Sequence, residues 1–160
     1  MSETTEPAAP PDSLVRFAEV LRERLPVLVA ADREKERVPF LCSLAPRDED
    51  YARVFEPAKA EKARSFYESM WKRTPSVVWN PRHTVIRFQV ALSDDFLTSH
   101  PRAAAFPKGF RDIANELAKG IPWAVFDLLE AGETLGLSTD GLVFLDNRLL
   151  WFPRPYVAVG

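Results

Sequence analysis

The stretch DGLVFLDNRLLWFPRPY, residues 140–156, indicates two apolar strands that fold back on each other at Asp146-Asn147. Aspartate and asparagine both tolerate the positive φ that a two-residue type I′ turn requires. Pro153 and Pro155 then end the second strand, because proline cannot donate to a ladder of hydrogen bonds. Such a turn predicts three opposite pairs: Phe144 with Leu149, Val143 with Leu150, and Leu142 with Trp151.

Both faces of this predicted hairpin are apolar. A strand pair with one wet face would alternate apolar and polar side chains, so each face here needs a cover. We expect helices of the chain on one face, and more sheet, a ligand or a second chain on the other. Asp140-Gly141, which precedes the first strand, indicates a turn.

The chain upstream of the hairpin supplies the expected cover. Residues 1–11 are polar and rich in proline, which predicts a disordered tail ahead of a single domain over residues 12–160. Helical periodicity and strand alternation then locate the elements. The predicted helices are 12–28 with a kink or a new start at Pro26, a short one ending at Phe55, 57–71 and 110–117. The predicted strands are 84–92, 123–129 and a short piece at 134–137. The apolar run 38–44, with Cys42 as a small core residue, fits a strand or a buried helical turn.

Helices first and strands afterwards predict an α+β domain, with the N-terminal helices packed on one face of a curved antiparallel sheet of four to five strands. The sequence has no Gly-rich loop and no alternating βα series, which disfavours a parallel nucleotide-binding sheet. This order of elements resembles that of NTF2-like (cystatin-like) proteins, in which early helices close the mouth of a bent, cone-shaped sheet. The resemblance implies a pocket inside the cone.

Composition narrows the class of protein. Residues 1–80 hold 13 basic and 14 acidic residues, and residues 81–160 hold 8 and 9, so each half carries a net charge of −1. Nucleic acid as a partner is disfavoured, because phosphate contacts need clustered lysine and arginine. No apolar run is long enough to span a membrane, and no signal peptide is evident. The single cysteine and the Arg, Ala and Pro bias favour the cytoplasm of a bacterium.

Asp127 and Arg87 are the candidate catalytic residues. Asp127 alternates in phase with Trp123 and Val125, so an inward orientation would place its carboxylate in an apolar environment that suits a general acid or base. Arg87 would bind an anionic group or pair with Asp127. The alternatives are an aspartate that faces water at a sheet edge, or one that pairs with Arg148.

Aromatic side chains are the candidate binding residues. They would line a cavity, anchor a partner or fill the core. The set comprises Trp71, Trp79, Trp123 and Trp151, with Phe152, Arg154 and Tyr156 from the Pro-rich end, where a tail clamped on the domain is the alternative. His83 and His100 lie 17 positions apart near prolines and indicate surface loops, not a metal site. No motif for a cofactor is present.

Two functions fit these observations. The first is a non-enzymatic binding or accessory module, which docks a protein partner or a second copy through the aromatic hairpin at 140–156. The second is an NTF2-like pocket protein, which binds an apolar small molecule or isomerises or dehydrates it, with Asp127 as acid or base. The poverty of catalytic side chains favours the first.

Overall fold

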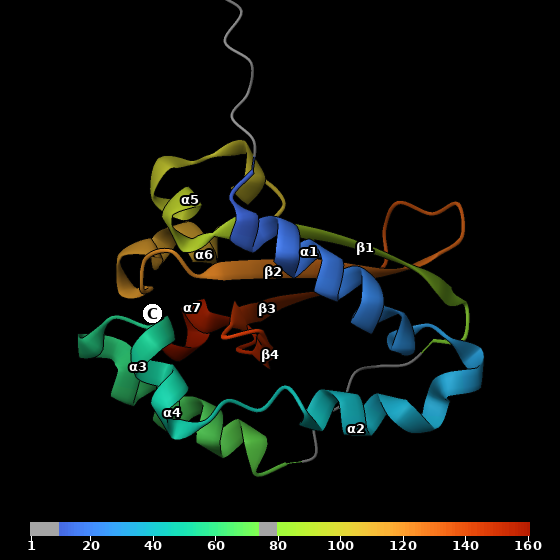
Figure 1. The fold of residues 1–160 in the computed structure, drawn as a ribbon, viewed down its shortest axis with the longest axis horizontal. Helices are drawn as coiled ribbons and strands as arrows, with labels where there is room; N and C mark the ends of the chain where they lie inside the picture. Colours follow the sequence, from blue (N-terminus) through green and yellow to red (C-terminus); the bar gives the residue numbers. More distant parts are fainter. Residues whose placement is uncertain (1–9, 74–79) are drawn as a thin grey trace, which may run out of the picture.

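Four antiparallel strands form the sheet in a computed structural model that describes residues 10–73 and 80–160. The strands are β1 (His83–Leu92), β2 (Pro122–Glu130), β3 (Leu137–Leu145) and β4 (Arg148–Trp151), and each pairs with its neighbours in chain order. Seven α-helices in the described residues pack with this sheet (Figure 1). The predicted α+β class is therefore confirmed, whereas the NTF2-like cone stays a prediction.

The hairpin between β3 and β4 has the predicted turn and register. Asp146 and Asn147 have φ values of 51° and 58°, as both central residues of a type I′ turn need. The observed pairs are Leu142 with Trp151, Val143 with Leu150, and Phe144 with Leu149. The residue types at the turn, Asp146 and Asn147, were therefore sufficient to predict which side chains of β3 and β4 lie opposite each other.

The sequence predicted a turn at Asp140-Gly141, but the structure has a bulge within β3 there. The pairing with β2 slips by one residue there, since Ala124 lies opposite Leu142 while Val125 lies opposite Asp140. Gly141 has φ +89°, and a Cβ atom on it would stand 2.1 Å from the carbonyl oxygen of Phe152. Glycine at this position therefore permits both the bulge and the close passage of the chain after β4. Of the predicted strand at 134–137, only Leu137 is in a strand, as the first residue of β3, where it pairs with Leu128.

One side of the sheet, which we call the α1 face, is covered by the N-terminal helices. These are α1 (Asp12–Arg24), the 3₁₀ helices Leu25–Leu28 and Ala31–Glu36, and α2 (Arg37–Cys42). Phe17 and Leu21 of α1 are fully buried in a cluster with Phe126 and Phe144, and the rings of Phe17 and Phe144 stack at 5.3 Å. The helical run 37–42 also exposes Cys42, which corrects the prediction of a core cysteine.

The opposite side, the α4 face, is covered by the other helices. They are α3 (Tyr51–Val54), α4 (Pro57–Trp71), α5 (Ser93–Thr98), α6 (Gly109–Asp112) and α7 (Pro155–Ala158), with 3₁₀ turns at Asp48–Asp50, Pro101–Ala103 and Ala114–Glu116. In Figure 1, α3 and α4 lie together beside α7, while α1 crosses β1 and β2. Trp123, Val143 and Phe152 are completely buried on this side.

Helices of the chain thus cover both faces of the hairpin, which corrects the prediction that they would cover only one. Every residue from Leu142 to Leu145 and from Leu149 to Phe152 is buried. Helices over 57–71 and 110–117 were predicted, but their periodicity did not show which sheet face they would cover, and α5 and α7, with four to six residues each, were not predicted. Helices this short show less than two turns of the 3.6-residue period.

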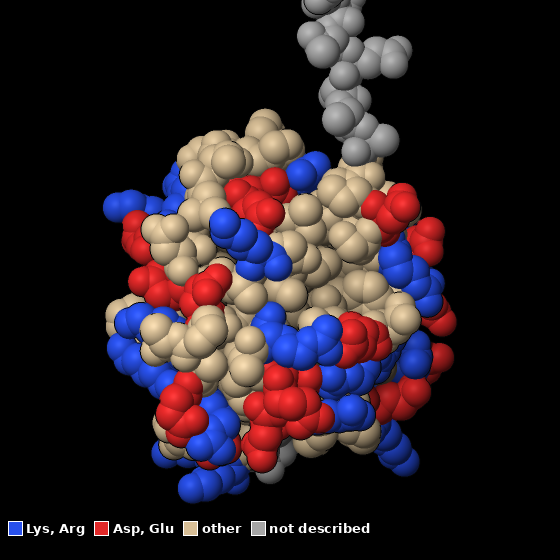
Figure 2. All heavy atoms as spheres, turned by 60° about the vertical axis from the view of Figure 1, so that its left-hand side comes forward, with Lys and Arg blue, Asp and Glu red and all other residues tan. Residues whose placement is uncertain are grey.

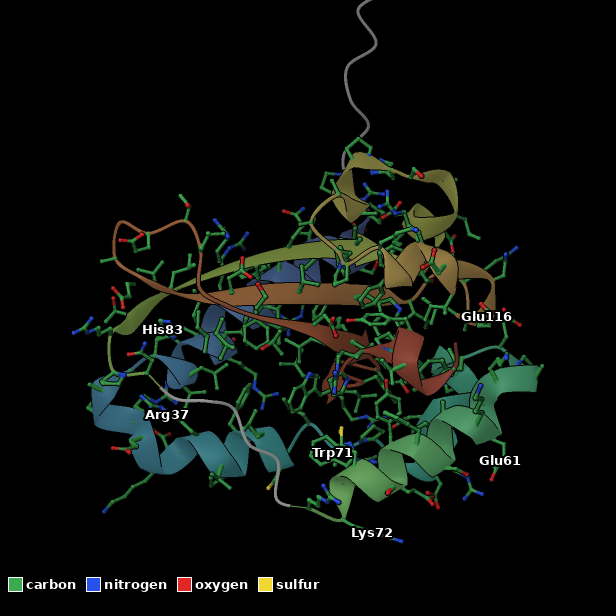
Figure 3. All side chains as sticks on the ribbon, turned by 180° about the vertical axis from the view of Figure 1, so that it is seen from behind. Arg37, Glu61, Trp71, Lys72, His83 and Glu116 are labelled. Atoms are coloured by element: carbon green, nitrogen blue, oxygen red, sulfur yellow. The ribbon has the colours of Figure 1, made fainter. Side chains whose placement is uncertain are left out.

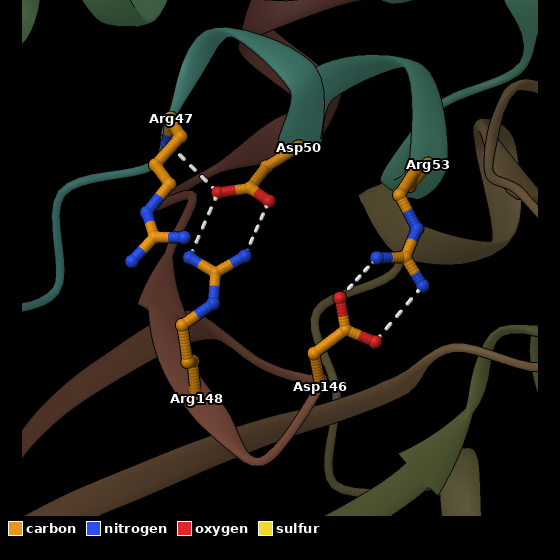
Figure 4. Close-up of polar contacts among 5 residues, drawn as sticks. All are labelled: Arg47, Asp50, Arg53, Asp146 and Arg148. Carbon is orange, nitrogen blue, oxygen red and sulfur yellow. Dashed lines mark hydrogen bonds and ion pairs between the residues drawn. The ribbon is translucent and has the colours of Figure 1, made fainter.

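Two ion pairs join the β3–β4 hairpin to α3 and to the 3₁₀ turn that precedes it (Figure 4). Asp50 is fully buried and accepts hydrogen bonds from the guanidinium of Arg148, at 2.6 and 3.1 Å, and from the backbone N–H of Arg47 at 2.7 Å. Burial alone would raise the pKa of Asp50, but these donors outweigh it, and the pKa lies below its usual value. Arg53 and Asp146 form a second, exposed pair beside the first.

Candidate functional site

Part of the α4 face is left uncovered. Three cross-strand rows follow one another along β1, β2 and β3 on this face, and they differ sharply in burial. The row of Ala91, Trp123 and Val143 is entirely buried under the helices. The next two, which we call the open rows, reach solvent. The open rows are Gln89, Val125 and Asp140, and then Arg87, Asp127 and Ser138.

A pocket of about 310 Å³ lies over the open rows. All six of their residues line it, and Ala105, Phe106 and Pro107 form an apolar wall. This volume stands at the lower end of the range for small-molecule sites, which combine apolar walls with a few convergent polar groups. The site therefore has the size and the mixed lining of a ligand pocket.

The wall is held in place by a buried ion pair. Asp95 accepts hydrogen bonds from the guanidinium of Arg102 at 2.9 and 3.0 Å and from the N–H of Leu92 at 2.8 Å. The pKa of Asp95 lies below its usual value, because these donors outweigh the effect of burial. Phe106 itself packs against the rings of Phe96 and Phe110, at 4.9 and 5.2 Å. A rigid wall pre-organises the pocket.

Arg87 and Asp127, the two predicted catalytic residues, meet on the pocket floor. One carboxylate oxygen of Asp127 accepts from two nitrogens of Arg87, at 2.7 and 3.1 Å, and the other accepts from the hydroxyl of Ser138. Arg87 also donates to the carbonyl of Thr134 at 3.0 Å. Of the alternatives for Asp127, pairing with Arg87 is the one observed. Both carboxylate oxygens are engaged, so the pair presents fixed polarity to the pocket.

Asp140 is the second carboxylate of the pocket, and unlike Asp127 it is not paired with an arginine side chain. It accepts from the backbone N–H of Arg154 at 2.7 Å and from the hydroxyl of Tyr156 at 3.1 Å. Burial raises the pKa of Asp140, and the two donors together with the more distant Arg154 charge only partly oppose this. Asp140 forms no ion pair within the described residues.

The predicted binding aromatics lie elsewhere. Trp123 and Phe152 are completely buried, and Trp151 is 9% exposed. Trp71 lies at the end of α4 (Figure 3). Its ring packs edge-on against that of Trp151, with the ring centroids 6.2 Å apart. These four side chains fill the core between helices and sheet and do not line the pocket. Trp79 lies outside the described residues.

Tyr156 and Arg154 are brought to the site by α7, although neither lines the pocket. The left-handed conformation of Arg154, with φ 48°, turns the chain so that its N–H points at Asp140. The Tyr156 ring packs directly on Gly109, where a Cβ atom would stand 2.3 Å from the ring. The terminal segment therefore clamps onto the domain, the alternative weighed for the Pro-rich end, and fixes the Asp140 carboxylate.

Comparison with protein-family models, with curated proteins and with solved structures gives no match for this chain.

Proposed function

We propose that the chain binds a small molecule with an apolar body in the pocket over the open rows. The observation that carries this proposal is the abrupt end of helix cover. Trp123 and Val143 are completely buried, yet Val125 and Asp127, two and four positions along the same strand face, line a pocket. The uncovered stretch is concave and combines an apolar wall with a few polar side chains, which is the usual make-up of a small-molecule site.

The lining favours a ligand with both apolar and hydrogen-bonding parts. Phe106 and Val125 offer apolar contact, while Gln89 supplies an exposed amide that both donates and accepts. The Arg87–Asp127 pair adds a fixed dipole at the far end of the floor. A ligand would gain affinity from the wall and orientation from the floor.

Catalysis of an isomerisation or dehydration by Asp127 stays a prediction. In its favour, Asp127 lies in the pocket beside Arg87. Arg87 and Ser138 already occupy three of the roughly four lone-pair sites of the carboxylate, so a proton has one free site, on the oxygen that accepts from Ser138. If Asp127 acts as a base, Asp127→Asn abolishes turnover but leaves ligand binding intact. Turnover that survives this substitution contradicts the catalytic role.

The binding proposal is tested by filling the pocket. Val125→Trp places an indole on the pocket floor, whereas the control Val85→Trp places one on the same sheet face outside the pocket, where Val85 is 41% exposed. A fragment library is screened by saturation-transfer NMR against the wild type and both variants. We expect hits that bind the wild type and Val85→Trp and are lost with Val125→Trp. Hits that persist in Val125→Trp, or no hits at all, contradict the proposal.

Docking of a protein partner or a second copy through residues 140–156 is a second candidate. The side chains of the hairpin are buried, so docking through them requires helices to move. The surface available without such movement is at the following helix, where Arg154 is exposed and Val157 is 50% exposed. Val157→Asp is expected to lower the mass measured by light scattering if copies associate there. An unchanged mass and unchanged partner recovery reject this candidate.

We also place the protein in the cytoplasm of a bacterium. The composition and the single free cysteine, Cys42, support this location. Figure 2 shows basic and acidic side chains mixed over one face, with no large area of a single charge, which agrees with the absence of a basic lobe in the sequence. None of the helices in residues 10–73 and 80–160 has the length and apolar character needed to cross a membrane.

A further inference from the structure

Asp140 is half-buried, and it differs from the buried carboxylates Asp50 and Asp95 because it forms no ion pair with a described residue. Asp50 and Asp95 are both buried, and each is held by a bidentate arginine. Asp140 is held only by neutral donors, the N–H of Arg154 and the hydroxyl of Tyr156. A carboxylate that is partly withdrawn from water without a direct ion pair is costly, and the folded chain retains one at the edge of a pocket.

The charged groups near Asp140 would not repel a cation strongly. Arg154 is the one charged side chain of the described residues that acts on it appreciably, and this residue is exposed. Tyr156 from α7 and Tyr67 from α4 are the other titratable groups close to it, and both are neutral phenols whose pKa lies above the usual value because of burial. Arg87, across the floor, is neutralised by Asp127 at 2.7 Å. The pocket as a whole therefore carries an excess of negative charge.

Apolar surface completes the site. Val125 lies directly between Gln89 and Asp140 in the first open row, and the wall of Ala105, Phe106 and Pro107 lines the same pocket. An ammonium group prefers a carboxylate and tolerates the face of an aromatic ring. A carboxylate beside an apolar wall thus matches a molecule with a positive charge at one end and an apolar body at the other.

We infer that the ligand of this pocket is an organic ammonium compound, whose charged nitrogen pairs with Asp140 and whose apolar part lies on Val125 and the 105–107 wall. This inference rests on the proposed binding function and specifies the chemical class of its ligand. The ammonium group supplies a directly paired counter-charge, which the described residues do not provide because Arg154 acts on Asp140 only from a distance. Asp140 acts here as a specificity-determining residue.

Three probes with one aromatic body and different charges test the inference. They are 2-phenylethylamine, which is cationic at neutral pH, 2-phenylethanol, which is neutral, and phenylacetate, which is anionic. Their dissociation constants are measured by titration NMR with the wild type and with Asp140→Asn. Asparagine is the matched substitution, because its oxygen accepts from the N–H of Arg154 and its amide donates to the oxygen of Tyr156, so that only the charge is lost.

We expect the wild type to bind the amine at least about tenfold more tightly than the alcohol, the lower end of the coupling seen for close charge pairs. In Asp140→Asn the two should bind with equal affinity. Equal affinities in the wild type, a preference that survives Asp140→Asn, or no binding of the amine each overturn the inference. If the alcohol binds equally well and is lost with Val125→Trp, the binding function stands and the ammonium specificity falls.

Discussion

The ion pair between Asp50 and Arg148 should be the costliest polar contact of the fold to break, and the cost should depend on which partner is removed. The Asp50 side chain is fully buried, whereas that of Arg148 is 26% exposed. Arg148→Ala leaves a buried carboxylate with the N–H of Arg47 as its remaining donor. Breaking a buried pair in this way costs about 3–5 kcal/mol of the free energy of unfolding.

Asp50→Ala should cost less. The guanidinium of Arg148 left behind already reaches solvent and can turn further toward it, so the loss is nearer that of hydrogen bonds to a charged group, about 1.5–3 kcal/mol. The double variant should then cost less than the sum of the single changes, because no unpaired charge remains buried. Urea unfolding at neutral pH, followed by tryptophan fluorescence, measures all three.

Asp146→Asn is the matched control. It removes a charge from the neighbouring pair with Arg53, in which both side chains are about half exposed, and asparagine keeps the positive φ of the turn. The midpoint of unfolding should not change, since exposed pairs contribute little. The reasoning is refuted if Arg148→Ala and Asp50→Ala cost equal amounts, or if the double variant costs the full sum.

Three further outcomes follow from the fold. Gly141→Ala should lower the free energy of unfolding by about 2–4 kcal/mol, because alanine strains the positive φ and its Cβ collides with the backbone of Phe152. Gly132→Ala is the control, since Gly132 has φ +84° and nothing within 4 Å, and it should cost only about 1–2 kcal/mol. Urea unfolding measures both. In acid titrations followed by circular dichroism, Asp95 should contribute stability above its usual pKa of 3.8, and that contribution should be lost as the pH falls through the lower folded value. The raised pKa of Asp140 has the opposite sign, so Asp140→Asn should be as stable as the wild type or more stable at neutral pH and should lose its advantage in acid.

The sequence determined the sheet well because its signals are local. Alternation placed β1 and β2 within a residue of their observed ends, and Asp146-Asn147 fixed the register of β3 and β4. The bulge at Gly141 was harder to foresee. A glycine after an aspartate is equally typical of a turn, and the close passage of Phe152 that requires glycine is a tertiary contact.

The site was predictable only in part. Alternation of β1 and β2 placed Arg87 and Asp127 on one face, and the structure pairs them on the pocket floor. Asp140 is not among the predicted site residues, because the pair Asp140-Gly141 is typical of a turn. What distinguishes Asp140 is its depth under α7 and the hydrogen bond from Tyr156, which depend on how the last helix packs. The tryptophans were predicted to bind a ligand or partner only because tryptophan is common at binding sites. Trp123 and the other described tryptophans instead pack in the core and do not line the pocket.

Chemical-shift mapping of a bound fragment locates the site on the molecule. A hit from the pocket screen is titrated into ¹⁵N-labelled wild type, and the backbone amide shifts are followed. The proposal predicts that the largest shifts fall on the open rows, at Gln89, Val125, Asp127 and Asp140, and on Phe106 across the pocket. Shifts confined to the α1 face or to α7, with the open rows unmoved, would contradict it.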